Sequence, residues 1–165
     1  MRKILFLSLI ILLGVLESCS KAPKQSDTES YSILKFDELG KFKIAQFTDI
    51  HWDENAKSND STIAIIKHVL KEEQPNLVIL SGDVVCYEPA KEGWESIARI
   101  FEESKIPWLV LMGNHDAELS MTREEIYQLL QSKAYYTIGK VDIEKCKIGD
   151  FILNIKSSDE NKDAA

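Results

Sequence analysis

From residue 41 onward, short apolar runs alternate with longer segments in which apolar residues recur every three or four positions. The short runs are expected to be buried strands and the longer segments amphipathic helices. The expected strands cover residues 42–47, 76–80, 107–112 and 150–155, and the expected helices cover residues 61–73, 91–104 and 122–131. This alternation of strand and helix predicts an α/β domain with a parallel sheet and right-handed crossovers.

The expected helices carry signals for their own ends. Ser61 is the expected N-cap of the first helix, and Pro75 follows its last turn. Thr122 and Glu125 have the spacing of a capping box at the start of the third helix, because each side chain can satisfy a free N–H of that first turn. These signals favour helices at the positions that the apolar spacing indicates.

The positions of a few large side chains separate core from surface. Trp94 lies on the apolar face of the second helix and Trp108 at the start of a strand, so both are expected in the core. His68 lies off the apolar stripe of the first helix and is flanked by charged residues. It is therefore expected on the surface and not in a site at the strand ends.

The N-terminus has the features of an export signal. Arg2 and Lys3 precede an apolar run over residues 4–16 that is too short to cross a bilayer as a stable helix, so residues 1–18 are expected to be a secretory signal peptide. The end of this run, with Cys19, resembles the lipobox of bacterial lipoproteins, although Glu17 is unusual there. The resemblance implies a lipidated Cys19, export and anchoring on the periplasmic or outer-surface side of a bacterial membrane. The alternative is a soluble exported protein in which Cys19 is incidental.

Residues 19–40 are mostly small and polar, so they are expected to form a flexible tether between the membrane and a domain at residues 41–165. The 165 residues are 44% hydrophobic and 28% charged, which suits one globular domain. The formal net charge of -7 argues against nucleic-acid binding. Cys86 and Cys146 are left after Cys19, and they either pair or stay separate as small buried side chains.

Polar residues follow each of the first three expected strands at once, in the segments TDIH (48–51), SGDVV (81–85) and GNHD (113–116). The carboxyl ends of parallel strands share one edge of the sheet, where ligands bind in such folds. Five side chains should converge there: Asp49, His51, Asp83, Asn114 and His115. Carboxylate oxygens, imidazole nitrogens and an amide oxygen together suit metal ions such as Zn, Fe and Mn.

Asp49 and His51 are two residues apart, so an extended backbone would place both side chains on one side, where they can bind a single ion. Gly82 allows a tight turn before Asp83, so that the carboxylate can reach between two ions.

These three segments resemble the first three sequence blocks of the calcineurin-like metallophosphoesterases, and most closely those of bacterial purple acid phosphatase-like lipoproteins. The resemblance implies hydrolysis of phosphate esters at a centre of two metal ions, Fe, Mn or Zn. Asp49 and His51 would hold one ion, Asp83 would bridge both and Asn114 would hold the second. A hydroxide between the ions would attack phosphorus.

The same resemblance assigns the proton chemistry to the third block. His115 would protonate or stabilise the leaving group, and Asp116 would orient the His115 ring. The expected partners are therefore a phosphate-ester substrate and, through Cys19, a membrane.

Two residues near these blocks leave the role of their side chains open. Cys86 stands where purple acid phosphatases carry a metal-binding tyrosine, and Tyr87 comes one residue too late to replace it. We expect Cys86 to be a buried structural thiol, because reactive thiols need an electropositive environment. Trp52 either lines the substrate pocket or packs in the core.

The chain has no histidine after His115, whereas the family completes its metal centre with a later lone histidine and a G-H-x-H block. The expected fold is therefore the N-terminal half of the four-layer αββα sandwich of this family, incomplete at its C-terminus, with one sheet face exposed. Such a chain is expected to bind metal weakly and to be weakly active or inactive alone. The alternative is a non-catalytic surface lipoprotein, a degenerate binding module that retains half of the fold.

Overall fold

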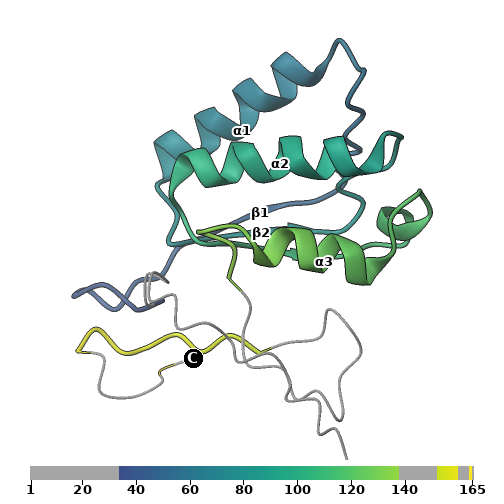
Figure 1. The fold of residues 1–165 in the computed structure, drawn as a ribbon. Coiled ribbons are helices and arrows are strands. Elements are labelled where there is room, and N and C mark those ends of the chain that lie inside the picture. The colour runs from purple at the N-terminus through teal and green to yellow at the C-terminus, as the bar shows by residue number, and fades with distance from the viewer. Residues whose placement is uncertain (1–33, 138–151, 160–163, 165) are drawn as a thin grey trace, which may run out of the picture.

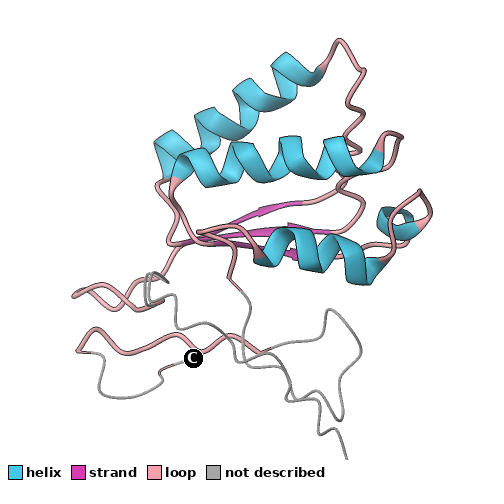
Figure 2. Cartoon of the chain, viewed as in Figure 1, coloured by secondary structure: helices cyan, strands magenta, loops and turns pink. Residues whose placement is uncertain are grey.

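The computed structural model describes residues 34–137, 152–159 and 164. A parallel sheet carries a layer of helices, with α1 and α2 side by side over the sheet and α3 packed against α2 (Figure 1). The strands and helices alternate along the chain as predicted (Figure 2). The elements are β1 (Ile44–Phe47), α1 (Asn59–Glu73), β2 (Leu77–Ser81), α2 (Ala90–Ser104), β3 (Trp108–Leu111), the short 3-10 helix η1 (His115–Ala117) and α3 (Arg123–Gln131).

The sheet has the order β1-β2-β3, and both strand pairs are parallel. Ile44 pairs with Leu77 at the beginning of β1, and Phe47 pairs with Leu80 at its end. Ser81 at the end of β2 pairs with Leu111 of β3. The three carboxyl ends therefore lie at one edge of the sheet, as the sequence predicts. This parallel sheet with helices packed against it confirms the predicted α/β class.

The main core lies between the sheet and the helices. Trp94 and Phe101 of α2 are fully buried, as is Trp108 of β3. The ring of Phe101 stacks on that of Trp108 with centroids 5.6 Å apart, and Tyr136 meets Trp108 edge-on at 5.0 Å. Aromatic pairs in these arrangements add stability beyond their area burial. The prediction that Trp94 and Trp108 belong to the core is confirmed.

The helix boundaries were predicted to within a few residues. The capping box of α3 is present, with Glu125 N–H donating to Thr122 Oγ1 and Thr122 N–H donating to the Glu125 carboxylate. The predicted helix over residues 61–73 is present as α1, but its predicted N-cap was wrong, because the helix begins at Asn59 and the N-cap is Ser58, not Ser61. The Asn59 side chain donates to the carbonyl oxygen of Asp53 at 2.8 Å. This bond ties Asn59, which lies two residues before Ser61, to the loop that precedes α1.

The face of the sheet opposite the main core is covered only in part by described residues. Leu77 and Leu109 point to that face and pack with Leu34 in a smaller cluster. Ile44 and Leu111 remain 47% and 41% exposed. Leu34 is buried in this cluster, so a residue before Lys41 also packs against the sheet.

The predicted strand over residues 150–155 does not form within its described part. An isolated parallel bridge joins Lys156 to Lys35, with Phe36 N–H donating to Lys156 O and Lys156 N–H donating to Leu34 O. Residues 150 and 151 lie outside the described residues, as do the predicted signal peptide, Cys19 and Cys146. Of the helices in the described ranges, none has the length and apolar character needed to cross a membrane.

Candidate metal centre

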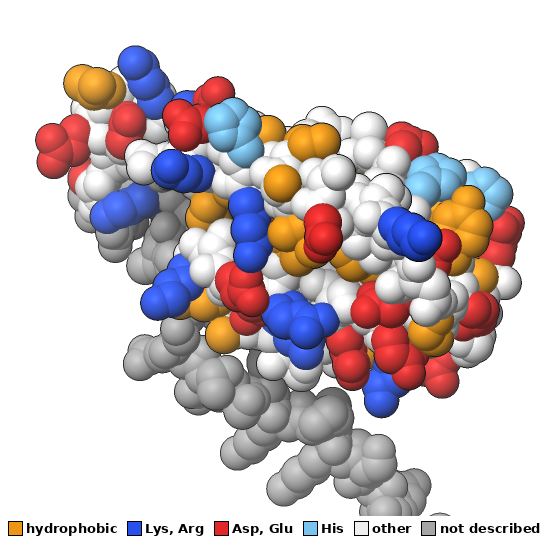
Figure 3. All heavy atoms as spheres, turned by 90° about the horizontal axis from the view of Figure 1, so that it is seen from above, with side chains coloured by type: hydrophobic (Ala, Val, Ile, Leu, Met, Phe, Trp, Pro, Cys, Tyr) orange, Lys and Arg blue, Asp and Glu red, His pale blue; other side chains and the backbone are white. Residues whose placement is uncertain are grey.

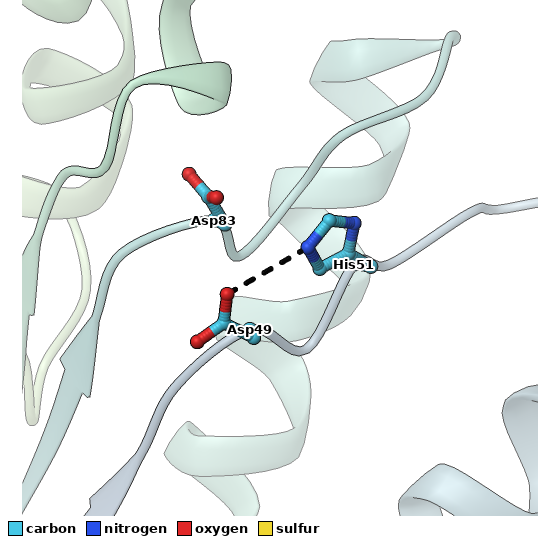
Figure 4. Close-up of side chains that lie close together, drawn as sticks. All are labelled: Asp49, His51 and Asp83. Atoms are coloured by element: carbon cyan, nitrogen blue, oxygen red, sulfur yellow. Dashed lines mark ion pairs between the residues drawn. The ribbon is translucent and has the colours of Figure 1, made fainter.

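The carboxyl edge of the sheet brings three of the predicted ligands together. Asp49 and His51 lie in the loop after β1, and Asp83 lies in the loop after β2. Each offers one ligand atom, and these atoms all lie within 4.8 Å of one another. His51 Nε2 is 3.8 Å from Asp49 Oδ1, and the three side chains face a common space (Figure 4). The predicted convergence of these side chains is therefore present.

The backbone that presents these ligands is not extended. Asp49, His51 and Asp83 have φ angles of 52°, 50° and 51°, in the left-handed region that non-glycine residues rarely adopt. The expectation that Asp49 and His51 share one side of an extended segment was therefore wrong, although both reach the same space. Such a conformation costs about 1 to 3 kcal/mol per residue and is concentrated at functional sites.

Hydrogen bonds between the two loops hold this unusual backbone in place. Asp49 N–H donates to Gly82 O at 3.1 Å, and His51 N–H donates to Asp83 O at 3.0 Å. Trp52 N–H donates to Val84 O at 2.8 Å. The backbone pairing of β1 with β2 therefore continues into the two loops that follow these strands. These main-chain bonds fix the backbone of Asp49 and His51 relative to that of Asp83.

Two glycines allow the loops after β2 and β3 to approach each other. Gly82 has a φ of 92°, and a Cβ on it would lie 3.1 Å from the Cα of Gly113. A Cβ on Gly113 would lie 2.2 Å from Asp83 Oδ1 and 2.6 Å from the Asp83 backbone nitrogen. The Asp83 carboxylate therefore occupies the space that any larger residue at 113 would need.

Asp116 does not orient the His115 ring, which corrects the prediction. The Asp116 side chain is 1% exposed, and its two oxygens accept backbone N–H groups from both loops. Oδ2 accepts from Asp83 at 2.9 Å and from Gly113 at 2.7 Å, while Oδ1 accepts from Val84 at 2.7 Å and from Val85 at 3.1 Å. A buried carboxylate needs such donors. Asp116 is therefore a clamp that positions Asp83.

His115 lies beside the three ligands and has a different partner from the predicted one. Its backbone N–H donates to Asp83 Oδ1 at 3.2 Å, and its ring centroid is 6.3 Å from that of His51. Its Nδ1 lies 2.6 Å from Glu118 Oε2, and this hydrogen bond, with the charge of Glu118, raises the pKa of His115. Sequence reasoning missed Glu118, although its position three residues after His115 was a usable signal.

Figure 3 shows histidine side chains next to acidic ones at one end of the visible face. The predicted ligands Asp49 and His51 are both exposed. Asn114 is also exposed and is the N-cap of η1, directly before His115. Its role as a ligand of the second metal ion stays a prediction.

The other residues singled out in the sequence lie around this centre or away from it. Cys86 is a free thiol and is only partly buried, so it is less enclosed than predicted. Burial, followed by the negative charges of Asp116, Asp83 and Asp49, raises its pKa to about 11. The environment is therefore electronegative, as expected for an unreactive thiol.

Trp52 packs in the main core with 4% exposure, and its Nε1 donates to Glu54 Oε2 at 2.9 Å. Of the two alternatives for Trp52, the structure thus supports packing. His68 is exposed on α1, away from the carboxyl edge, as predicted.

Comparisons with known proteins agree with this geometry. The family model of the calcineurin-like phosphoesterases matches residues 42–161. The chain is 32% identical over 110 residues to the Arabidopsis thaliana protein named "Probable inactive purple acid phosphatase 29", covering 56% of this chain and 28% of that protein. It is 30% identical over 158 residues to "Phosphatase DCR2" of Saccharomyces cerevisiae, covering 82% of this chain and 27% of that protein.

A second Arabidopsis thaliana relative, named "Probable inactive purple acid phosphatase 14", is 30% identical over 116 residues, covering 59% of this chain and 29% of that protein. The chain thus spans less than a third of the length of these relatives. The extent of the family match, together with the Asp49, His51 and Asp83 group, shows that the chain belongs to the calcineurin-like phosphoesterase family.

Proposed function

We propose that the group formed by Asp49, His51 and Asp83 binds metal and serves the hydrolysis of phosphate esters. The observation that carries the proposal is the convergence of three ligand atoms within 4.8 Å at the carboxyl edge of a parallel sheet. The positive φ angles of all three residues support the proposal, because such backbone conformations are concentrated at functional sites.

The donor set fits the metal ions that the family uses. Two carboxylates and one imidazole suit Fe, Mn or Zn, and the two negative charges favour a cation at this exposed edge. Asp49 and His51 would hold one ion, Asp83 would contact both ions and Asn114 would hold the second. Bound metal would supply an activated water molecule and neutralise charge on the phosphate group.

The remaining residues prepare the site for this chemistry. Asp116 and Gly113 fix the Asp83 carboxylate, the former through the N–H bonds and the latter by leaving space. His115, whose ring centroid is 6.3 Å from that of His51, would give a proton to the leaving oxygen. The substrate class is a phosphate ester.

Metal binding is tested directly on the purified chain by titration calorimetry with Mn²⁺ or Zn²⁺. Asp49→Asn and Asp83→Asn should each weaken binding by at least about 10-fold, because each removes a charged ligand. The matched control is Asp53→Asn, whose Oδ1 accepts Asn55 N–H and lies outside the ligand group. Equal affinity in all four proteins would refute the site.

Hydrolysis is tested with p-nitrophenyl phosphate and bis-p-nitrophenyl phosphate, which separate monoesterase from diesterase activity. We expect weak, metal-dependent turnover that Asp49→Asn abolishes and Asp53→Asn retains. The names of two plant relatives describe inactive proteins, which favours a non-catalytic module as the second candidate. Metal binding by the same sample without turnover of either ester would support that candidate.

The proposed location is the surface of a membrane, through lipidated Cys19. This proposal rests on the sequence of residues 1–19 alone. Labelled fatty acid should be incorporated into the wild-type chain in a bacterial host and not into Cys19→Ser. A Cys19→Ser chain that stays with the membrane fraction would contradict lipid anchoring.

A further inference from the structure

The 3-10 helix η1 places residues 115 and 118 on one side of a tight turn. Such a helix has three residues per turn, so side chains at positions i and i+3 are eclipsed. Glu118 N–H donates to His115 O at 3.1 Å, which closes this turn. The His115 and Glu118 side chains are 47% and 60% exposed, so their contact depends on the turn and not on burial.

The backbone on both sides of the His115 ring is fixed. His115 N–H donates to Asp83 Oδ1, and the next residue, Asp116, is buried and accepts three N–H groups from the loop after β2 and one from its own loop. The ring can therefore change its direction only through its own side-chain torsions. The contact of Nδ1 with Glu118 Oε2 at 2.6 Å restrains these torsions.

We propose that Glu118 is the positioning residue for His115, holding the imidazole through Nδ1 so that Nε2 is the nitrogen that exchanges a proton with the substrate. The orientation of the ring by Glu118 rests on the geometry of η1. The proton transfer to the substrate rests on the proposed hydrolysis. Asp116 is not available for the same task, since both of its oxygens already accept main-chain N–H groups.

The hydrogen bond with Glu118 also determines which form of the ring remains after proton donation. As the bond from phosphorus to the leaving oxygen breaks, that oxygen keeps the bonding electron pair and takes the proton from Nε2. The ring becomes neutral with its remaining proton on Nδ1, where the Glu118 carboxylate accepts it. Proton donation from Nε2 thus requires no change of tautomer, because Glu118 stabilises the product form.

The structural part is tested by NMR on the ¹⁵N-labelled chain, which contains three histidines. Two-bond and three-bond ¹H–¹⁵N spectra at a pH where the rings are neutral report the tautomer of each. We expect the Nδ1–H form to predominate for His115, and Glu118→Ala to lower its ratio to the Nε2–H form by roughly fivefold or more. Glu118→Gln keeps an acceptor oxygen and should give an intermediate ratio.

His68, exposed on α1, is the internal reference in the same spectra, and Glu72→Ala is the control for loss of an exposed acidic residue. Glu72→Ala should leave the His115 ratio unchanged, and Glu118→Ala should leave the His68 ratio unchanged. A His115 tautomer ratio that is the same in wild type and in Glu118→Ala would overturn the inference, whether or not the chain hydrolyses an ester.

The catalytic part is tested by comparing leaving groups in any preparation that hydrolyses phosphate esters. Glu118→Ala should lower kcat for an alkyl phosphate by about 10- to 100-fold, because that leaving group needs a proton. It should change kcat for p-nitrophenyl phosphate much less. An equal loss on both substrates would indicate a merely structural role and overturn the inference, whereas no hydrolysis by wild type would refute the proposed function and leave the tautomer result standing.

Discussion

The Asp116 carboxylate accepts the backbone N–H of Asp83 at 2.9 Å and so ties the third polar segment to the second. Through the same oxygen it also accepts the N–H of Gly113 at 2.7 Å. The carboxylate is buried, and its hydrogen bonds are the connection that sets the distance between the loops after β2 and β3. The position of the predicted ligand Asp83 thus depends on Asp116, whose side chain is itself too enclosed to reach a substrate.

Replacing this carboxylate with an amide tests the clamp. In Asp116→Asn, one oxygen becomes an NH₂ group, which must then face two backbone N–H donors. We expect a loss of about 2 to 4 kcal/mol in the free energy of unfolding, because two buried donors lose a charged acceptor. Urea denaturation followed by circular dichroism measures this loss.

The control for this variant is Asp37→Asn, whose exposed carboxylate accepts the N–H groups of Leu39 and Lys41 through one oxygen. Asparagine keeps that oxygen, so the change in stability should stay within about 1 kcal/mol. An Asp116→Asn chain as stable as Asp37→Asn would show that the four hydrogen bonds do not hold the loops.

The contact between Gly113 and Asp83 predicts a selective loss of metal binding. A methyl group at 113 would lie 2.2 Å from Asp83 Oδ1 and 2.6 Å from its backbone nitrogen, so Gly113→Ala must displace the ligand. We expect calorimetry with Mn²⁺ to show affinity at least about 10-fold weaker. Gly40→Ala is the matched control, because a Cβ at that position meets no atom within 4 Å.

Gly40 has a φ of 72°, so its alanine variant should lose about 1 kcal/mol of stability and keep its metal affinity. Gly40→Ala thus reports the effect of backbone strain alone, and Gly113→Ala reports the displacement of Asp83. If both variants lower the metal affinity equally, the close contact of Gly113 with Asp83 is not needed for metal binding.

The sequence predicted the placement of the ligands better than the conformation that presents them. The parallel sheet follows from the alternation of apolar runs, and it alone brings Asp49 and Asp83 to one edge. The left-handed backbone at both residues depends on hydrogen bonds between loops that are distant in sequence, such as Asp49 N–H to Gly82 O. The local pattern of apolar and polar residues carries no information on hydrogen bonds between distant loops.

The third segment shows the same limit for individual side chains. Both Asp116 and Glu118 follow His115 closely, and an acidic residue next to a histidine suggests a pair. The structure pairs His115 with Glu118, because η1 turns Asp116 inward, where four N–H groups need an acceptor. The choice between the two acids depends on the tertiary contacts of the turn, and the sequence spacing permits both.

The raised pKa of Cys86 predicts slow alkylation. With a pKa of about 11 instead of 9.0, the thiolate fraction of Cys86 at pH 8 falls roughly 100-fold. The more basic thiolate is also the stronger nucleophile, which recovers about 10-fold of the lost alkylation rate. Iodoacetamide should therefore modify Cys86 about 10-fold more slowly than an ordinary thiol. Mass spectrometry measures the rate in a chain with Cys19→Ser and Cys146→Ser.

The matched control for this rate moves the thiol to the surface, with Cys86→Ser and Ser61→Cys in the same background. Ser61 is exposed on α1 and is not a member of the group formed by Asp49, His51 and Asp83. A Cys86 rate equal to that of the thiol at position 61 would contradict the protection by burial and by neighbouring carboxylates.

The carboxylate of Glu88 predicts a specific loss of stability in acid. It accepts the N–H of Ala90 at 2.8 Å and both the N–H and the hydroxyl of Ser120, and these bonds hold the pKa of Glu88 below 4.5. A lowered folded-state pKa stabilises the fold above the unfolded-state value, and the contribution disappears as the pH falls through the folded-state value. Wild type should therefore be more stable than Glu88→Gln in urea at pH 7, and the difference should shrink between pH 5 and about pH 3.

Glu72→Gln, an exposed change on α1, controls for the loss of one negative charge. A difference for Glu88→Gln that is constant from pH 7 to pH 3 would show that the ionised carboxylate does not tie the start of α2 to Ser120.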